Sequence, residues 1–378
     1  MDYQSKSVDL HRKTGGKIEV TSKVSVQNRE DLSLAYTPGV AGPCLSIKEN
    51  PNEALELTAT KNMVAVISDG SAVLGLGNIG PLAALPVMEG KCVLFKRFAD
   101  ISAFPIVLAT QNTEEIISAV KAIAPTFGGI NLEDIAAPRC FEIEERLKAE
   151  LDIPVMHDDQ HGTAIVVLSG LINALKVTGK KKEHVRVVVN GAGAAGIAIT
   201  KLLLHFGVED IILCDSKGIV SKDRTDITPE KQHLLERINK NNKTGVLHEA
   251  LVDADVFIGV SKAGVLKSDD VKRMKEGAMI FAMANPTPEI MPEEAQKGGA
   301  LIIATGRSDF PNQINNSLVF PGVFKGALTN RVKKITDDMK VRAAEALAGV
   351  VKEPTTEKII PGPFDEGVVE AVSSAIYE

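Results

Sequence analysis

Short apolar runs alternate with segments of helical periodicity along most of the chain. Residues 63–67 and 104–109 have the length of buried strands, and residues 113–124 and 140–151 have the period of amphipathic helices. Further apolar runs occupy residues 185–190, 210–215, 256–259, 278–283 and 300–304, and helices are predicted near 229–239 and at 268–275 between them. This alternation predicts an α/β protein in which mostly parallel strands are covered by helices.

The two ends of the chain are patterned differently. Residues 1–28 are polar and weakly patterned, which predicts an arm or a short helix, and the turn residues within 29–43 predict an ordered loop. Near the other end, helices are expected close to 334–352 and 366–377.

The strongest local pattern begins at the strand 185–190, which runs directly into Gly191-Ala-Gly-Ala-Ala-Gly196 and an apolar helix. A second strand follows and ends at Asp215, as in dinucleotide-binding folds. The predicted fold is therefore a doubly wound (Rossmann) domain, with the pyrophosphate at the helix N-terminus. Its predicted cofactor-binding residues are Gly191, Gly193, Ala194, Ala195, Gly196 and Asp215. Asp215 would repel a 2′-phosphate and favour NAD, whereas Ser216 and Lys217 would soften that preference towards NADP.

A second glycine run, Gly75-Leu-Gly-Asn-Ile-Gly80, has the same spacing but the wrong surroundings. Its nearest strand ends several residues upstream, Pro81 follows at once, and the residues about twenty positions on are basic. We interpret this run as a tight turn that faces the substrate.

Adjacent carboxylates occur at the ends of two predicted apolar segments. Asp158 and Asp159 lie between a short apolar run and a long apolar helix predicted at 163–176, and Glu133 and Asp134 end another apolar segment. Asp158 and Asp159 could simply cap that helix. They would also stand beyond the carboxyl end of a strand, where ligands bind in α/β proteins.

Four further polar residues stand out, each with a structural alternative. Lys91 lies in an apolar stretch; it could reach the surface, or burial could lower its pKa and make it a general base. Tyr36, one of three tyrosines, could be a packed loop residue. Asn285 and Asn316 could be turn formers, although they follow strands of the predicted dinucleotide-binding sheet.

Composition and charge narrow the class of protein. A length of 378 residues suggests two domains, taken here as 1–160 and 161–378. The apolar content of 44% and charged content of 24% are those of a globular protein, and a net charge of −6 with scattered cations argues against nucleic acid as a partner. No signal-like segment or apolar run long enough for a membrane span is evident, so a cytoplasmic protein without a membrane partner is expected.

Eight motifs in order resemble the malic enzyme family, from about Tyr36 to Gly322. They are Ala35-Tyr-Thr-Pro-Gly-Val40, Gly75-Leu-Gly-Asn-Ile-Gly80, Glu89-Gly-Lys-Cys-Val-Leu94, Asn131-Leu-Glu-Asp-Ile135, His157-Asp-Asp-Gln-His-Gly-Thr-Ala164, Asp215-Ser-Lys-Gly218, Ala284-Asn-Pro-Thr-Pro288 and Asn315-Asn-Ser-Leu-Val-Phe-Pro-Gly322. The resemblance implies an N-terminal α/β domain for malate and metal and a C-terminal Rossmann domain for NAD(P). The implied reaction is the oxidative decarboxylation of malate to pyruvate.

The resemblance also implies particular roles. Glu133, Asp134 and Asp159 would hold a divalent metal, and an all-carboxylate set selects a hard ion such as Mg²⁺ or Mn²⁺. Lys91 would be the general base, Tyr36 the acid, and Asp158 the residue that holds Lys91 in place. Residues that match the family's carboxylate-binding asparagines are Asn285, which also borders the cofactor site, and Asn316.

The chain departs from the family pattern in two ways. Larger members carry an arginine just before Gly-Leu-Gly, where this chain has Ser71-Ala72. The chain is also short for the family and resembles its compact prokaryotic members, which implies a homodimer whose active sites are completed across the interface. Two alternatives remain: a malolactic enzyme, which retains NAD and releases lactate, and a non-catalytic nucleotide-binding sensor.

Overall fold

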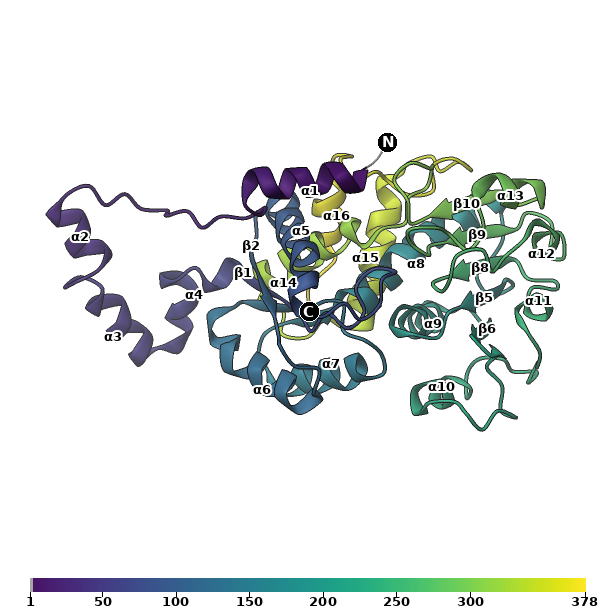
Figure 1. Ribbon diagram of the computed structural model, residues 1–378, viewed down its shortest axis with the longest axis horizontal. Coiled ribbons are helices and arrows are strands. Elements are labelled where there is room, and N and C mark those ends of the chain that lie inside the picture. The colour runs from purple at the N-terminus through teal and green to yellow at the C-terminus, as the bar shows by residue number, and fades with distance from the viewer. Residues whose placement is uncertain (1–2) are drawn as a thin grey trace.

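Two separate β-sheets organise the protein, and the computed structural model describes residues 3–378 (Figure 1). The first sheet has the order β2-β1-β3-β4 and the second the order β10-β9-β8-β5-β6-β7. All pairings are parallel except that of β7 with β6. The strands are β1 (Met63–Ser68), β2 (Ser102–Val107), β3 (Gly129–Leu132), β4 (Val155–His157), β5 (Arg186–Asn190), β6 (Asp210–Asp215), β7 (Gly218–Ile219), β8 (Val256–Gly259), β9 (Met279–Ala282) and β10 (Ile302–Thr305). The predicted α/β class and the doubly wound C-terminal sheet are confirmed.

Helices cover both faces of the first sheet. Successive residues of β1 point to opposite faces, so Val64 and Val66 belong to one apolar cluster and Ala65 and Ile67 to another. The cluster of Val64 includes residues of α5 (Pro81–Ala99), and that of Ala65 includes residues of α6 (Thr113–Ile123) and α7 (Arg139–Glu150). A sheet buried on both faces explains why its strands are continuous apolar runs.

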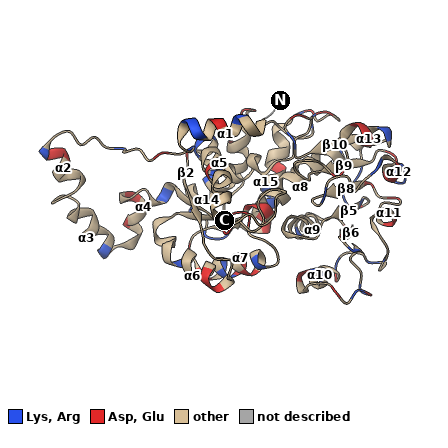
Figure 2. Cartoon of the chain, viewed as in Figure 1, with Lys and Arg blue, Asp and Glu red and all other residues tan. Residues whose placement is uncertain are grey.

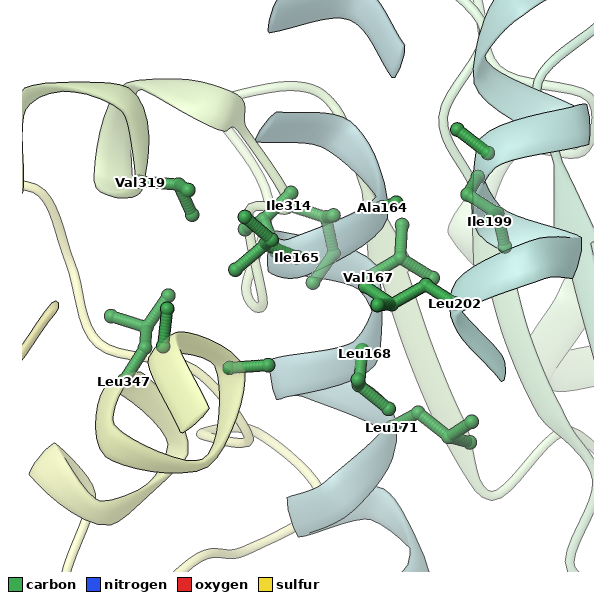
Figure 3. Close-up of a cluster of buried hydrophobic side chains, with 14 of the residues drawn as sticks. Ala164, Ile165, Val167, Leu168, Leu171, Ile199, Leu202, Ile314, Val319 and Leu347 are labelled. Carbon is green, nitrogen blue, oxygen red and sulfur yellow. The ribbon is translucent and has the colours of Figure 1, made fainter. Parts of the chain in front are cut away.

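The helix α8 (Asp158–Thr178) is the central element of the core. It packs against α9 (Ala194–Phe206) of the second sheet and against α15 (Asp337–Val350), with buried apolar residues from all three between them (Figure 3). We expected no apolar run with the length of a membrane span, but α8 has that length and composition. Because 67% of its most apolar window is buried inside the protein, α8 matches the core helix of a globular protein.

The remaining helices are shorter and are distributed around the two sheets and in the C-terminal segment. They are α10 (Pro229–Leu234), α11 (Leu247–Ala250), α12 (Ser268–Val271), α13 (Pro292–Lys297), α14 (Phe320–Thr329) and α16 (Val368–Ser374), with 3₁₀ turns η1 (Pro51–Glu53), η2 (Thr60–Asn62), η3 (Ala124–Thr126) and η4 (Asn316–Leu318). Although α14 follows the second sheet in sequence, it packs against α5. Phe320 and Phe324 meet Phe95 edge-on, at centroid distances of 4.7 and 5.4 Å. The C-terminal helices therefore join the two halves.

The helices of the described N-terminal region have no buried residue. The first, α1 (Tyr3–Thr14), lies against the body, whereas α2 (Arg29–Ala35), α3 (Ala41–Glu49) and α4 (Ala54–Leu57) form a projecting arm (Figure 1). The prediction of a loop over residues 29–43 is wrong, because Asn28 caps α2 and α3 follows within six residues. Figure 1 shows α2 and α3 projecting from the body on an extended segment, and Figure 2 shows charged residues near the helix ends, at the start of α2 and the end of α3.

Candidate active site

A cavity of about 650 Å³ lies beyond the carboxyl ends of strands from both sheets. The polar residues that line it come from segments far apart in the sequence. From the N-terminal half they are Ser7 and His11 on α1, Lys17 after α1, Lys91 on α5, and Glu133 and Asp134 after β3. From the C-terminal half they are Asp159 and Thr163 on α8, Ser261 after β8, Asn285 after β9, and Asn315 and Asn316 before α14. Gly75 of the turn Gly75–Gly80 and the preceding Leu74 line the same cavity, and the orientation of this turn towards a substrate stays a prediction.

Three carboxylates form a compact cluster in this cavity. One oxygen each from Glu133, Asp134 and Asp159 lies within 4.8 Å of the others. Asp134 has a left-handed backbone (φ 54°), and its N–H donates to Asp159 Oδ2 at 2.7 Å. Asp158 and Asp159 occupy the first turn of α8, but His157 holds the N-cap position and no side chain caps the helix. The capping interpretation of the two aspartates is therefore wrong.

Burial and mutual repulsion shift the acidity of this cluster. Removal from water, the largest cause for each group, raises the pKa of Asp134 to about 9 and that of Asp159 to about 6. The same cause raises the pKa of Glu133. For Asp134, the charges of Asp159 and Glu133 add to the shift. Such a cluster gains most from a cation that all three carboxylates share.

The residues fit a hard divalent cation. All donors are carboxylate oxygens, which Mg²⁺ and Mn²⁺ prefer. Asp134 Oδ2 is buried and has no hydrogen-bond partner among the described residues, so it is free to act as a ligand. Glu133, Asp134 and Asp159 would hold the ion, and the predicted ligand set is thus brought together.

Lys91 is buried beside the acid cluster instead of reaching the surface. Its side chain is only 8% exposed, and its Nζ lies 2.5 Å from Asp158 Oδ2, 2.9 Å from Glu133 Oε1 and 4.1 Å from the ring centre of Phe320. Burial alone would lower the pKa of Lys91, but the carboxylates of Asp158 and Glu133 outweigh it and raise the pKa. The expectation of a lowered pKa is wrong for this arrangement, because it considered burial without the two partners.

Asp158 can reach Lys91 only because a glycine follows one helical turn later. A Cβ at Gly162 would lie 1.8 Å from Asp158 Oδ1, so any larger residue there would displace the carboxylate. Asp158 is fully buried, and burial raises its pKa to about 7 even though Lys91 opposes the shift. The predicted contact between Asp158 and Lys91 is therefore present and depends on the Asp-Asp-Gln-His-Gly spacing.

The dinucleotide turn borders the same cavity. Gly191 has a positive φ of 116°, and a Cβ at Gly196 would lie 1.6 Å from the carbonyl oxygen of Gly191, so both positions require glycine. Gly193 caps α9, whose first two residues are Ala194 and Ala195, and Ala195 lines the cavity. The N-terminus of α9 is thus placed to receive a pyrophosphate.

Asp215 ends β6 as predicted, but its charge is already paired. Arg224 donates to both of its carboxylate oxygens at 2.7 and 3.0 Å, and Lys231 Nζ lies 2.6 Å from Oδ2. Burial would raise the pKa of Asp215, but hydrogen bonds from these cations and from the Lys217 N–H lower it overall. Of the residues that pair with Asp215, the sequence indicated only Lys217; Arg224 and Lys231 were not anticipated.

The predicted acid Tyr36 is not brought to the cavity by this chain, and the predicted cofactor residue Asp215 does not line it either. Tyr36 ends α2 on the projecting arm, is 67% exposed, and does not line the cavity that contains Lys91 (Figure 1).

Two buried acids that support the site were not anticipated. Glu144 accepts from the His157 N–H at 3.0 Å and contacts His161 Nε2 at 2.8 Å, which fixes the junction of β4 and α8. Glu289 accepts from the backbone N–H groups of Ser261 and Ala284, which joins the loops after β8 and β9. The sequence gives no signal for Glu144, which looks like a solvent-facing acid in the helical pattern of α7. For Glu289 the one available signal is its position in the turn-forming segment that follows Asn285.

A dinucleotide turn that borders a cavity with a buried acid cluster and a buried lysine is typical of a nicotinamide-dependent oxidoreductase. Family comparison agrees. Residues 15–148 match the model of the malic enzyme N-terminal domain, and residues 160–373 match that of the malic enzyme NAD-binding domain. The chain belongs to the malic enzyme family.

Relatives and solved structures are similar over nearly the whole chain. A bifunctional malic/malolactic enzyme of Bacillus subtilis is 56% identical and covers 100% of this chain and 92% of its own length. An NAD-dependent malic enzyme of Geobacillus stearothermophilus is 58% identical over 96% of this chain and 76% of its own length. The crystal structure of an NAD-dependent malic enzyme from Thermotoga maritima superimposes with a TM-score of 0.95 at 52% identity, covering 98% of each chain.

The buried pair of Lys91 and Asp158 leads to a prediction about stability. Lys91→Met should lower the free energy of unfolding by about 3–5 kcal/mol at pH 8, because it leaves Asp158 and Glu133 without their buried cation. The loss should be smaller at pH 5.5, where these raised-pKa carboxyls can take up protons. Urea unfolding at both pH values measures the difference.

The double variant Lys91→Met/Asp158→Asn is the control for this prediction. It removes one of the two stranded charges and should recover part of the stability at pH 8. An equal loss for the single variant at both pH values would show that packing, and not charge, explains the effect.

Proposed function

We propose that this protein converts (S)-malate to pyruvate and CO₂ by divalent-metal-dependent oxidative decarboxylation, with hydride transfer to NAD or NADP. The observation that carries the proposal is the shared cavity: Lys91 and its partner Asp158 lie against the three-carboxylate cluster, and the same cavity reaches the dinucleotide turn. Hydroxyl deprotonation, charge stabilisation and hydride transfer require these three components within reach of one small substrate.

The residues of the chain divide the proton chemistry between them. A divalent cation would supply the charge that polarises the oxygen on C2 of malate, and the nicotinamide would accept the hydride from that carbon. Lys91 takes the proton of the 2-hydroxyl, and Asp158 holds its Nζ in place. Loss of CO₂ from the oxidised substrate leaves an enolate, and a proton that Tyr36 delivers to its carbon gives pyruvate.

Glu133 connects the candidate metal ligands to the candidate base. It lies 2.9 Å from Lys91 Nζ and also belongs to the three-carboxylate cluster. The charges of Asp158, Glu133 and Asp159 raise the pKa of Lys91, and a cation bound by Glu133 and Asp159 would offset two of these three. Metal binding would thus bring Lys91 closer to the acidity that a general base needs near neutral pH.

Both cofactors are compatible with the adenine end of the site. Asp215 alone would repel a 2′-phosphate, but Arg224 and Lys231 neutralise it. Relatives named NAD-dependent and NADP-dependent malic enzymes are 58% and 48% identical to this chain. We propose NAD as the first cofactor to test and NADP as its alternative.

The position of Tyr36 supports a homodimer with shared active sites. The arm that carries Tyr36 has no buried residue and exposes large apolar side chains, including Leu34 (72% exposed) and Leu45 (59% exposed). Exposed apolar surface of this kind indicates an interface. We propose that the arm packs on a second copy and delivers Tyr36 to the cavity of that copy.

The reaction is tested by following nicotinamide absorbance with malate and Mn²⁺, in parallel with NAD, with NADP and with a chelator. We expect reduced cofactor and pyruvate in equal amounts, and no reaction after chelation. Lactate without accumulation of reduced cofactor would contradict oxidative decarboxylation and favour the malolactic alternative. The Bacillus subtilis relative is named a bifunctional malic/malolactic enzyme, so lactate is assayed as well. Cofactor binding without any turnover would favour the non-catalytic sensor, although the predicted acid-base and metal residues are all present.

The shared site is tested by mixing two inactive variants, Tyr36→Phe and Lys91→Ala, under conditions that exchange subunits. If the two residues act from different chains, each mixed dimer contains one intact site, and about a quarter of the wild-type activity should return. If both residues act from the same chain, no mixed dimer contains an intact site and no activity returns. Each variant exchanged with itself is the control.

A further inference from the structure

The proposed site has more negative than positive charge before a substrate enters. Four carboxylates, those of Glu133, Asp134, Asp158 and Asp159, surround the single ammonium of Lys91. One divalent cation would still leave a net charge of about −1, counting the four acids as ionised. A dicarboxylate substrate adds two negative charges, so it needs a further cation away from the metal ligands.

In the body of the protein, the basic side chains of Lys91 and Arg139 already pair with carboxylates of the protein. Lys91 is held between Asp158 and Glu133. Arg139 donates to Asp69 at 2.8 Å and to Ser71 at 3.1 Å, and it does not line the cavity. The cavity wall beside Ser71 is formed by Ala72, which carries no charge.

Lys17 is the remaining lysine in the cavity lining, which contains no arginine among the described residues. Its Nζ donates to the carbonyl oxygen of Pro86 at 2.7 Å, and its backbone N–H donates to Glu89 at 2.9 Å. A Cβ placed on Gly90 would lie 3.2 Å from Lys17 Nζ, which puts this ammonium beside the residue that precedes Lys91. Lys17 is therefore fixed on α5, one turn from the predicted base.

His11 provides a second group on the same wall. Its Nδ1 must donate to the carbonyl oxygen of Ser7 at 2.6 Å, because a carbonyl only accepts. Its Nε2 is shielded from solvent and has no hydrogen-bond partner among the described residues, although the imidazole lines the cavity. Because Nδ1 is used by Ser7, Nε2 is the ring nitrogen that remains for a contact with a ligand in the cavity.

We propose that the N-terminal segment from Ser7 to Lys17 forms the wall of the site that selects dicarboxylate substrates: Lys17 pairs with the substrate carboxylate that does not reach the metal ligands, and His11 contacts that carboxylate through Nε2. The inference rests on the proposed function, since it assumes a dicarboxylate such as malate. Partial burial lowers the pKa of Lys17, and the charge of Glu89 opposes that shift. The sequence did not reveal this wall, because residues 1–28 have no apolar periodicity.

Steady-state kinetics of the full-length protein with Mn²⁺ and saturating cofactor test the proposal. Lys17→Met should raise KM for malate about 10- to 100-fold, the loss expected for a charged hydrogen bond, while kcat changes less than about threefold. Lys17→Arg should retain most of the affinity because it keeps the charge. His11→Gln should raise KM by a smaller factor, and Lys13→Met, which removes a lysine of α1 outside the cavity lining, should leave KM unchanged.

Competitive inhibitors separate charge recognition from a general distortion of the site. In Lys17→Met, inhibition by succinate, which has two carboxylates, should weaken by the same factor as malate binding. Inhibition by butyrate, which has one carboxylate, should not change. An unchanged KM for malate, or equal weakening of both inhibitors, would overturn the inference and leave the proposed function intact. A wild-type protein that does not oxidise malate would refute the proposed function, and the inference with it.

Discussion

The buried ammonium of Lys91 is the interaction on which the rest of the site depends. Asp158 and Glu133 contact its Nζ directly, and Asp134 and Asp159 lie just beyond Glu133. Four acids gathered in one water-poor cavity would otherwise keep their protons, because an isolated buried carboxylate is costly. Lys91 stands on α5, Glu133 follows β3 and Asp158 opens α8, so one cation joins three elements and gives the acid cluster its geometry. A divalent cation bound by Glu133, Asp134 and Asp159 would offset the negative charge that the Lys91 ammonium leaves unpaired.

Stability and chemistry are coupled through α8. Its first turn carries Asp158 and Asp159, and its remaining turns form the apolar core that α9 and α15 share (Figure 3). Near the far end of α8, the buried Asn173 donates to the carbonyl oxygens of Ala348 and Ile359. The helix that places the acids is thus held by the second sheet and by the C-terminal segment together. Substitutions in this core are expected to displace the acid cluster as well as to destabilise the protein, since packed interiors transmit changes in shape.

Local patterns revealed the parts of the fold and site whose causes are local. The strands of both sheets are apolar runs, and the dinucleotide turn requires glycine at Gly191 and Gly196, so both could be predicted from the residues themselves. The state of Lys91 could not, because it is decided by Asp158, 67 positions away. The pairing of Asp215 with Arg224, the support from Glu144 and Glu289, and the wall carrying Lys17 likewise depend on tertiary contacts. The short helix α1 agrees with the prediction of an arm or a short helix over residues 1–28, whereas α2 and α3 escaped prediction because their residues pack on no core.

Calorimetric titration with Mn²⁺, in two buffers of different ionisation enthalpy, tests the central claim most directly. Because burial raises the pKa of Asp134 to about 9 and that of Asp159 to about 6, a cation must displace protons below those values. We predict one ion per chain, an apparent affinity that rises from pH 6 to pH 9, and proton release that falls over the same range. Asp134→Asn should abolish most of the binding, and Asp152→Asn, at an exposed acid, should not. Absence of binding, or an affinity independent of pH, would contradict the assignment of these buried acids as a metal site.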